Sequence, residues 1–418
     1  MMRAQAAKMK YAYGAMSFFL LFTSWAIWWG FFQLWLTSKA GGIMLTGAQV
    51  GIFFSIYAIA SVCVLFGYGA LQDRLGLRRQ ILIFVAALAA LNGPFVTWIL
   101  RPLLQYNFAA GVIVGAAFFA IAFAGAMAII EAYFGRFCVR TGIIYGHMRM
   151  WGSVGYAVAL VSAGFLFTID PLMVFWASSL LGLILLIVQL FWKVEIPPQE
   201  LPNQIQAATP AQTPPATSEA IRELIYNRNF WAVVGFALLT WSVYQIYESQ
   251  MFPDFYTDHF LDEALGQKIF GIFIGVQAGI EALLMSIVPF VIARFGAKRT
   301  LLASALVMAF IVFGSATATS VALIMLTKIF HALMVPLIVL GLMDFITHNF
   351  DLRLTATVYL VGFYVTSYIG NILLSQPFGM LRDAIGYQGV FVIFGCAMLL
   401  GFFLALFAFA DDPRRVSK

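Results

Sequence analysis

The sequence contains little charge and few cysteines or histidines for its length. Only 10% of the 418 residues are Asp, Glu, Lys or Arg, whereas 62% are hydrophobic and the mean hydropathy is +0.93. Soluble domains carry about 25% charged residues, so this composition excludes an ordinary water-soluble fold. The cysteines and histidines show no disulfide or metal-ligand spacing, which predicts no metal site. They are Cys63, Cys138, Cys396, His147, His259, His331 and His348.

Motifs for covalent or ATP-driven chemistry are also missing. The sequence contains no G-x-S-x-G, no Walker P-loop and no H-E-x-x-H. No segment outside the apolar runs is long enough to form a nucleotide-binding domain. We therefore expect neither an enzyme nor a cofactor. The net charge of +6 is explained by basic residues in the predicted cytoplasmic segments, and it therefore does not indicate a nucleic-acid partner.

What the sequence has instead is a series of twelve apolar runs. Each has the roughly 20 residues that a helix needs to cross the hydrocarbon core. Lipid offers backbone amides no partners, so the runs are read as helices. Most Lys and Arg residues lie in the segments that become cytoplasmic if the N-terminus is inside. These features predict an all-α, multi-pass protein of a bacterial inner membrane, with 12 transmembrane helices and both termini cytoplasmic. The predicted spans begin near Met16, Val50, Gln80, Phe108, Gly146, Pro171, Phe230, Ile269, Leu301, Val321, Ala356 and Val390.

One long polar segment, residues 193–229, interrupts the apolar runs. It is rich in Pro, Ala, Gln and Thr and cannot bury a core, so it is read as a flexible cytoplasmic linker. Within it, Ser218 to Tyr226 is a candidate for a short amphipathic helix. The linker divides the chain into two six-helix halves, residues 1–192 and 230–418.

A loop pattern of basic, apolar, Gly, any, basic and Arg occurs once in each half. It lies at residues 74–79 and again at 294–299, which indicates an internal duplication. The first copy resembles the cytoplasmic loop signature of the major facilitator superfamily, in which an Asp and a basic cluster tie neighbouring helices together. With the spans and the linker, it predicts a major facilitator fold of two pseudo-symmetric halves. Charges that only set the orientation are the alternative. The motif residues are Gly69, Asp73, Arg74, Gly76, Arg78 and Arg79.

Charged side chains inside spans are candidate functional groups, because each costs roughly 2.5 to 3.5 kcal/mol on insertion. Glu131 ends the predicted fourth span and Arg149 opens the fifth. A guanidinium paired with a carboxylate offers donors and acceptors suited to sugar hydroxyls. A structural ion pair, or two interfacial charges, is the alternative.

The second half contains further intramembrane polar residues. Glu248 lies in the seventh span and Lys328 in the tenth, and we predict a buried ion pair because either charge alone would neutralise. Gln277 and Glu281 share a face of the eighth span, and His331 shares a face of the tenth with Lys328. Hydrogen bonds between helices, or a satisfied core histidine, are the alternatives. We expect polar groups of both halves to converge near the midplane, where such transporters bind substrate.

Several segments carry a resemblance to one family over about residues 17–407. They include Ser24-Trp25, Trp28-Trp29, Gln72 to Arg78, Pro102 to Asn107, Arg149 to Ser153, Gln277 with Glu281, His331 with Pro336, and Ala384 to Gln388. In these segments the chain resembles the oligosaccharide/proton symporter family, which contains lactose, raffinose and sucrose permeases. The tryptophan pairs, Tyr156 and Glu281 are similar to the sucrose permease branch.

The resemblance implies roles for residues in both halves. Glu131 and Arg149 would bind the sugar, and Tyr156 would stack on it. Gln277, Glu281 and His331 would be the ligands of the second half. Glu248 and Lys328 would keep a structural ion pair. The expected partners are a small sugar, protons and the lipid bilayer, and we expect a monomer.

Two departures from the family concern proton coupling. Met334 replaces the family's proton-carrying Glu, and Ile311 replaces the Arg that accompanies it. The remaining candidates for proton coupling are Glu281, His331 and Glu131.

The leading prediction is a secondary active transporter. It imports a disaccharide or short oligosaccharide, sucrose-like, with protons, by alternating access. An uncoupled sugar facilitator, a sugar or drug efflux transporter and a non-transporting membrane sensor are the alternatives.

Overall fold

The chain is described by a computed structural model that covers residues 2–39, 41–75, 79–192, 224, 226–351 and 354–409. All regular elements in these residues are helical, and several long helices contain a π-helical stretch, labelled η. The helices of the first part of the chain are α1 (Met2–Thr37), α2 (Gly47–Leu75), α3 (Gln80–Ala90), α4 (Asn92–Phe95), η1 (Val96–Leu100), α5 (Arg101–Tyr106), α6 (Phe108–Phe119), η2 (Ala120–Ala124), α7 (Gly125–Thr141), α8 (Tyr145–Ile169) and α9 (Met173–Phe191).

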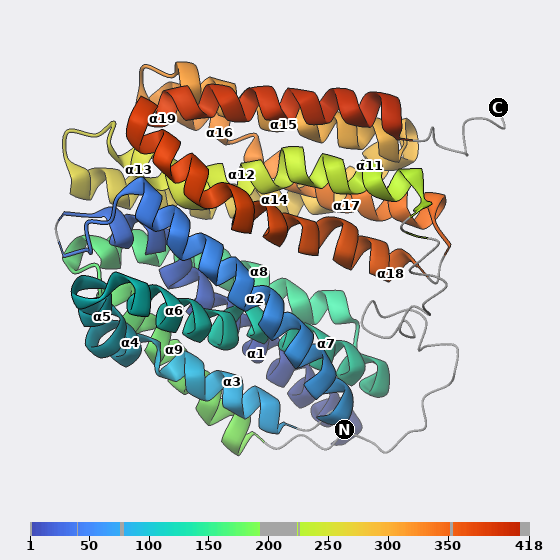
Figure 1. The fold of residues 1–418 in the computed structure, drawn as a ribbon. Helices are drawn as coiled ribbons and strands as arrows, with labels where there is room; N and C mark the ends of the chain where they lie inside the picture. The colour runs from blue at the N-terminus through green and yellow to red at the C-terminus, as the bar shows by residue number, and fades with distance from the viewer. Residues whose placement is uncertain are drawn as a thin grey trace. The chain divides into compact units, whose positions relative to one another are not determined.

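The second part of the chain contains the remaining helices (Figure 1). They are α11 (Arg228–Phe236), η4 (Ala237–Ser242), α12 (Val243–Ile246), η5 (Tyr247–Met251), α13 (Phe252–Thr257), α14 (Glu263–Phe295), α15 (Ala297–Thr317), α16 (Val321–Lys328), α17 (His331–Asn349), α18 (Thr355–Thr357), η6 (Val358–Val365) and α19 (Thr366–Ala408).

The chain forms two compact units. Unit 1 comprises Met1–Leu45, Ile56–Thr209 and Asp262–Val276, and unit 2 comprises Thr46–Ser55, Pro210–Leu261 and Gln277–Lys418. The predicted linker at 193–229 lies almost wholly outside the described residues, as does the helix predicted for Ser218 to Tyr226. The division into halves at that linker therefore stays a prediction.

Unit 1 is built around α1, which packs against α8 and α9, while α3 packs against α9. Trp28 of α1 is fully buried and stacks on Phe119 of α6, with 4.3 Å between the ring centroids. Some of the polar groups in this core are paired with one another, which offsets the cost of burying them. Tyr13 donates a hydrogen bond to Gln189 Oε1 at 2.5 Å, and Gln189 Nε2 donates to Ser17 Oγ at 2.9 Å. These bonds join α1 to α9.

Unit 2 is built around α15 and α19. Helix α15 packs against α17 and α19, and α11, η4 and α12 lie along α19, as Figure 1 shows. Gly386 has φ 76°, a left-handed conformation that favours glycine, and it interrupts α19. The chain turns there, so α19 is two helices rather than one.

Ten helices in the described residues are long and apolar enough to cross a membrane, or eleven if the bent pair Gln80–Ala90 and Asn92–Tyr106 forms one span. One of them, Val358–Ala408, contains the break at Gly386. At about 1.5 Å per residue it would far exceed the hydrocarbon core, whereas either side of Gly386 is close to one crossing. The count of twelve and the orientation of the termini stay predictions.

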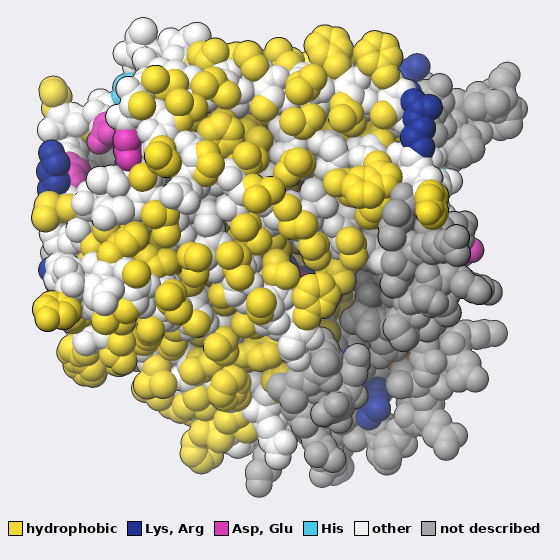
Figure 2. All heavy atoms as spheres, viewed as in Figure 1, with side chains coloured by type: hydrophobic (Ala, Val, Ile, Leu, Met, Phe, Trp, Pro, Cys, Tyr) yellow, Lys and Arg dark blue, Asp and Glu magenta, His cyan; other side chains and the backbone are white. Residues whose placement is uncertain are grey.

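Hydrophobic side chains cover much of the surface. On the face shown in Figure 2, they extend over the helices, and the charged side chains lie toward the two margins. Large exposed apolar residues include Trp98, Phe191, Phe290 and Phe407, each more than half exposed. Apolar surface of this extent suits lipid rather than water.

The start of α2 is held within unit 2 by an acidic cap. Asp383 accepts hydrogen bonds from the backbone N–H groups of Gly47 and Ala48, each at 2.9 Å. A carboxylate at a helix N-terminus satisfies otherwise unpaired amides and complements the helix dipole. Gly379 allows the close approach, because a Cβ there would overlap the Gly47 carbonyl oxygen.

The predicted cytoplasmic loop motif is only partly described. Gly76 and Arg78 lie outside the described residues, and so do the side chains of Asp73 and Arg74. Arg79 is described, and its Nη2 donates to the carbonyl oxygens of Gln189 at 2.7 Å and Trp192 at 2.5 Å. It therefore satisfies carbonyl groups at the end of α9, a position that favours a cation.

Candidate functional site

Two clusters of polar residues lie inside the predicted spans, one in each unit. In unit 1, Arg149 Nε on α8 donates a hydrogen bond to Glu131 Oε1 on α7 at 2.9 Å. The Arg149 side chain is 30% exposed and that of Glu131 is 44% exposed, so the pair is open on one side. The Arg149 guanidinium also lies over the Phe22 ring, 4.2 Å from its centroid. The structure thus brings together the two charges that the sequence singled out.

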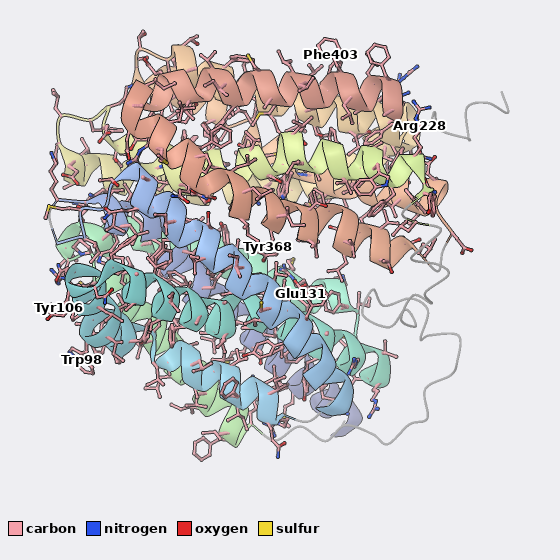
Figure 3. All side chains as sticks on the ribbon, viewed as in Figure 1. Trp98, Tyr106, Glu131, Arg228, Tyr368 and Phe403 are labelled. Carbon is pink, nitrogen blue, oxygen red and sulfur yellow. The ribbon has the colours of Figure 1, made fainter. Side chains whose placement is uncertain are left out.

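The position of Glu131 in its span differs from the prediction. Figure 3 labels Glu131, which lies within α7 rather than at its end, because the helix continues to Thr141. After Glu131 the helix continues through residues 132–141, which are mostly apolar but include Arg136 and Arg140. The first charged residue after the apolar run therefore does not mark the end of the helix.

Aromatic rings lie next to the unit 1 pair. Tyr156 lies two turns after Arg149 on α8, and its ring centroid is 5.7 Å from that of Trp25 on α1. Trp25 in turn makes an edge contact with Phe22, the ring that packs on Arg149. Unit 1 therefore combines a hydrogen-bonding ion pair with partly exposed aromatic faces.

In unit 2, Lys328 is fully buried at the end of α16. Its Nζ contacts Glu248 Oε2 and donates to the Tyr244 hydroxyl at 3.3 Å. The rings of Tyr244, Tyr247 and Phe252 surround the ammonium, with Phe252 nearest at 4.5 Å from Nζ to the ring centroid. A carboxylate and aromatic faces both compensate a desolvated cation.

His331 extends this cluster toward Glu281. The Tyr244 hydroxyl and His331 Nδ1 form a hydrogen bond of 2.7 Å, and Nδ1 lies 3.5 Å from Glu248 Oε2. On the other side of the ring, Nε2 lies 4.0 Å from Glu281 Oε2 on α14. The imidazole thus stands between two carboxylates of different helices.

Gln277 lies one turn before Glu281 on α14. It is 4% exposed, and its Oε1 has no hydrogen-bond partner among the described residues. Met334 and Ile311, the two apolar replacements at the expected proton-coupling positions, are completely buried. The unit 2 cluster therefore combines one lysine, one histidine, two carboxylates and a buried amide.

Two local features of this cluster were missed by sequence reasoning. Glu248 lies on the π-helical turn η5, which changes the direction of its side chain relative to a regular α-helix. The tenth predicted span is one run, Val321–Asn349, in which a two-residue turn separates the end of α16 at Lys328 from the start of α17 at His331. The Tyr244 hydroxyl contacts both Lys328 and His331. In the sequence, only its position one turn before Glu248 indicates this role.

These two clusters contain the polar side chains that the sequence predicts as sugar ligands. Within the described part of the chain, no group of three or more His, Cys, Asp or Glu side chains could hold a metal ion. Cavities of about 350 Å³ and 310 Å³ lie in unit 2, and no predicted sugar ligand lines them.

Comparison with known proteins gives consistent results. The sequence matches the family described as LacY proton/sugar symporter over residues 3–417. It is 34% identical to sucrose permease of Escherichia coli over 393 residues, which is 93% of this chain and 92% of that protein. It is 32% identical to raffinose permease of Escherichia coli over 396 residues, 95% of this chain and 92% of that one.

Solved structures are similar in fold. The nucleoside transporter NupG matches with a TM-score of 0.76 and 17% identity, covering 97% of this chain and 100% of that one. A D-xylose-proton symporter matches with a TM-score of 0.67 and 14% identity, covering 97% and 98%. The predicted all-α major facilitator fold is confirmed by this likeness and by the helical structure.

Proposed function

The chain belongs to the LacY proton/sugar symporter family, and we propose that it imports a disaccharide or short oligosaccharide, sucrose-like, together with protons. It is a transporter rather than an enzyme, and a multi-pass protein of the inner membrane. Its functional state is the monomer in the lipid bilayer.

The Glu131 and Arg149 pair carries the proposal for sugar binding. Arg149 uses Nε and Glu131 uses one carboxylate oxygen in their mutual hydrogen bond. A guanidinium has five donors and a carboxylate two acceptor oxygens, so the pair has capacity for sugar hydroxyls. The aromatic ring of Tyr156, beside Trp25, suits the apolar face of a sugar ring.

In unit 2 the proposed sugar ligands are Gln277, Glu281 and His331. The Gln277 amide oxygen is buried without a hydrogen-bond partner among the described residues, and a sugar hydroxyl would supply one. Glu281 and His331 approach each other to 4.0 Å, close enough for both to contact one hydroxyl-rich ligand. Glu248 and Lys328 are proposed to hold this group in place without contacting the sugar.

Proton coupling is assigned to Glu281, His331 and Glu131. Met334 and Ile311 carry no titratable group, so the proton must use a carboxylate or the imidazole. Glu281 is the first choice, because it lies beside His331, which lies in turn beside Glu248.

The test is counterflow of radiolabelled sugars in proteoliposomes that contain the purified protein. We expect exchange of sucrose or raffinose, and accumulation when the pH outside is lower than inside. Absence of exchange for every disaccharide and trisaccharide would contradict sugar transport. Exchange that never leads to accumulation would leave a facilitator, the function that the apolar residues at 311 and 334 favour.

A further inference from the structure

An aromatic row runs along α1 away from the Glu131 and Arg149 pair. The Phe22 ring packs on the Arg149 guanidinium, and the distance between the ring centroids of Phe22 and Trp25 is 6.3 Å. Trp29 follows one turn later and stacks on Trp25 with 6.1 Å between centroids and 28° between planes. All three residues belong to unit 1.

Residues of two other helices flank this row. Tyr156 of α8 is 5.7 Å from Trp25, and Tyr57 of α2 is 5.5 Å from Trp29, again between ring centroids. Trp25, Trp29, Tyr57 and Tyr156 are all partly exposed. Trp28, on another face of α1, is fully buried in the core. One side of α1 thus serves packing, whereas on another side Trp25 and Trp29 are partly exposed, next to the phenol rings of α2 and α8.

The position of this row along the helix differs from that of aromatic residues that anchor a protein at the membrane interface. Tryptophans of that kind gather at the two membrane interfaces, whereas Trp25 and Trp29 lie well inside the apolar helix Lys8–Thr37. The row also continues directly to Arg149, and a charged guanidinium in a span faces a polar interior rather than lipid.

We infer that Trp25 and Trp29 form consecutive stacking subsites for successive rings of an oligosaccharide, an inference that rests on the proposed sugar transport. One sugar ring is held by the ion pair and stacks beside Tyr156 and Trp25. The next ring stacks on Trp29. Four residues of helix advance about 6 Å, which is comparable to the step from one sugar ring to the next. Trp29 therefore sets the preference for chain length.

The inference is tested with purified protein in detergent, by equilibrium dialysis of radiolabelled methyl glucoside, sucrose and raffinose. Trp29→Ala should weaken binding of both sucrose and raffinose, whose second ring stacks on Trp29, by up to about tenfold and leave that of methyl glucoside unchanged. Trp29→Phe, which keeps an aromatic face, should retain most of the affinity. Trp25→Ala should weaken all three sugars. Trp98→Ala removes an exposed tryptophan outside the row, labelled in Figure 3, and should change none of them.

The possible results separate this inference from the proposed function. Wild-type protein that binds none of the sugars would overturn both. Wild-type binding that Trp29→Ala leaves intact for raffinose would overturn the stacking row alone. An equal loss for all three sugars in Trp29→Ala would also overturn it, because it would indicate that Trp29 only supports the structure.

Discussion

The two ion pairs of this transporter, Arg149 with Glu131 and Lys328 with Glu248, differ in how deeply they are buried. Arg149 and Glu131 share one hydrogen bond and are 30% and 44% exposed, whereas Lys328 is completely buried against Glu248 and three aromatic rings. An open pair can exchange part of its mutual attraction for contacts with a ligand. A buried pair cannot, because any lost contact leaves a desolvated charge. We therefore assign recognition to the first pair and support to the second.

The largest effect is expected where the buried pair is broken. Glu248→Ala or Lys328→Ala should destabilise the protein by roughly 3 to 5 kcal/mol, because the remaining charge loses its partner. Removing both should cost less than removing either one. Expression level and thermal unfolding in detergent measure this, with exposed Lys8→Ala as the control. A double variant no more stable than the single variants would show that the two charges do not compensate each other.

The open pair should respond in the opposite way. Arg149→Lys and Glu131→Gln should abolish sugar uptake but leave thermal unfolding close to that of the wild type. Lysine keeps the charge but not the planar array of donors, and glutamine keeps the size but not the charge. Uptake per molecule of protein in the membrane is the readout, and exposed Arg294→Lys is the control. Normal uptake by either variant would remove the pair from the sugar site.

A smaller effect is expected from the hydroxyl that joins the lysine to the histidine. Tyr244→Phe removes the hydroxyl that bonds both Lys328 Nζ and His331 Nδ1. We expect the free energy of unfolding to fall by about 1 to 3 kcal/mol and sugar uptake to fall roughly tenfold. Tyr247→Phe is the matched control, because that buried hydroxyl bonds Ser315 instead. If both variants lower uptake equally, Tyr244 has no special role in positioning His331.

Much of this architecture could be predicted from the sequence. The long apolar runs indicate helices because lipid leaves no other way to satisfy the backbone. Charges such as Glu131, Arg149, Glu248 and Lys328 stand out for the same reason, since a lone charge in a span is costly. Opposite sign was enough to suggest which ones approach each other.

The local geometry could not be predicted. The π-helical turn at Tyr247–Met251 and the two-residue turn between Lys328 and His331 depend on tertiary packing and leave no periodic signal in the sequence. Gly386 is one glycine among 35, and the sequence around it does not reveal the left-handed backbone conformation that divides α19. The aromatic rings around Lys328 are likewise ordinary apolar residues in the sequence.

In this transporter we propose that sugar and protons move together although residues 311 and 334 carry no titratable group. The most direct test adds sugar to a lightly buffered, de-energised suspension of cells that express the protein, and records the external pH. We expect a sugar-dependent rise in pH, which Arg149→Lys abolishes and Glu281→Gln abolishes or reduces. A flat pH while radiolabelled sugar still equilibrates across the membrane would contradict it and identify an uncoupled facilitator.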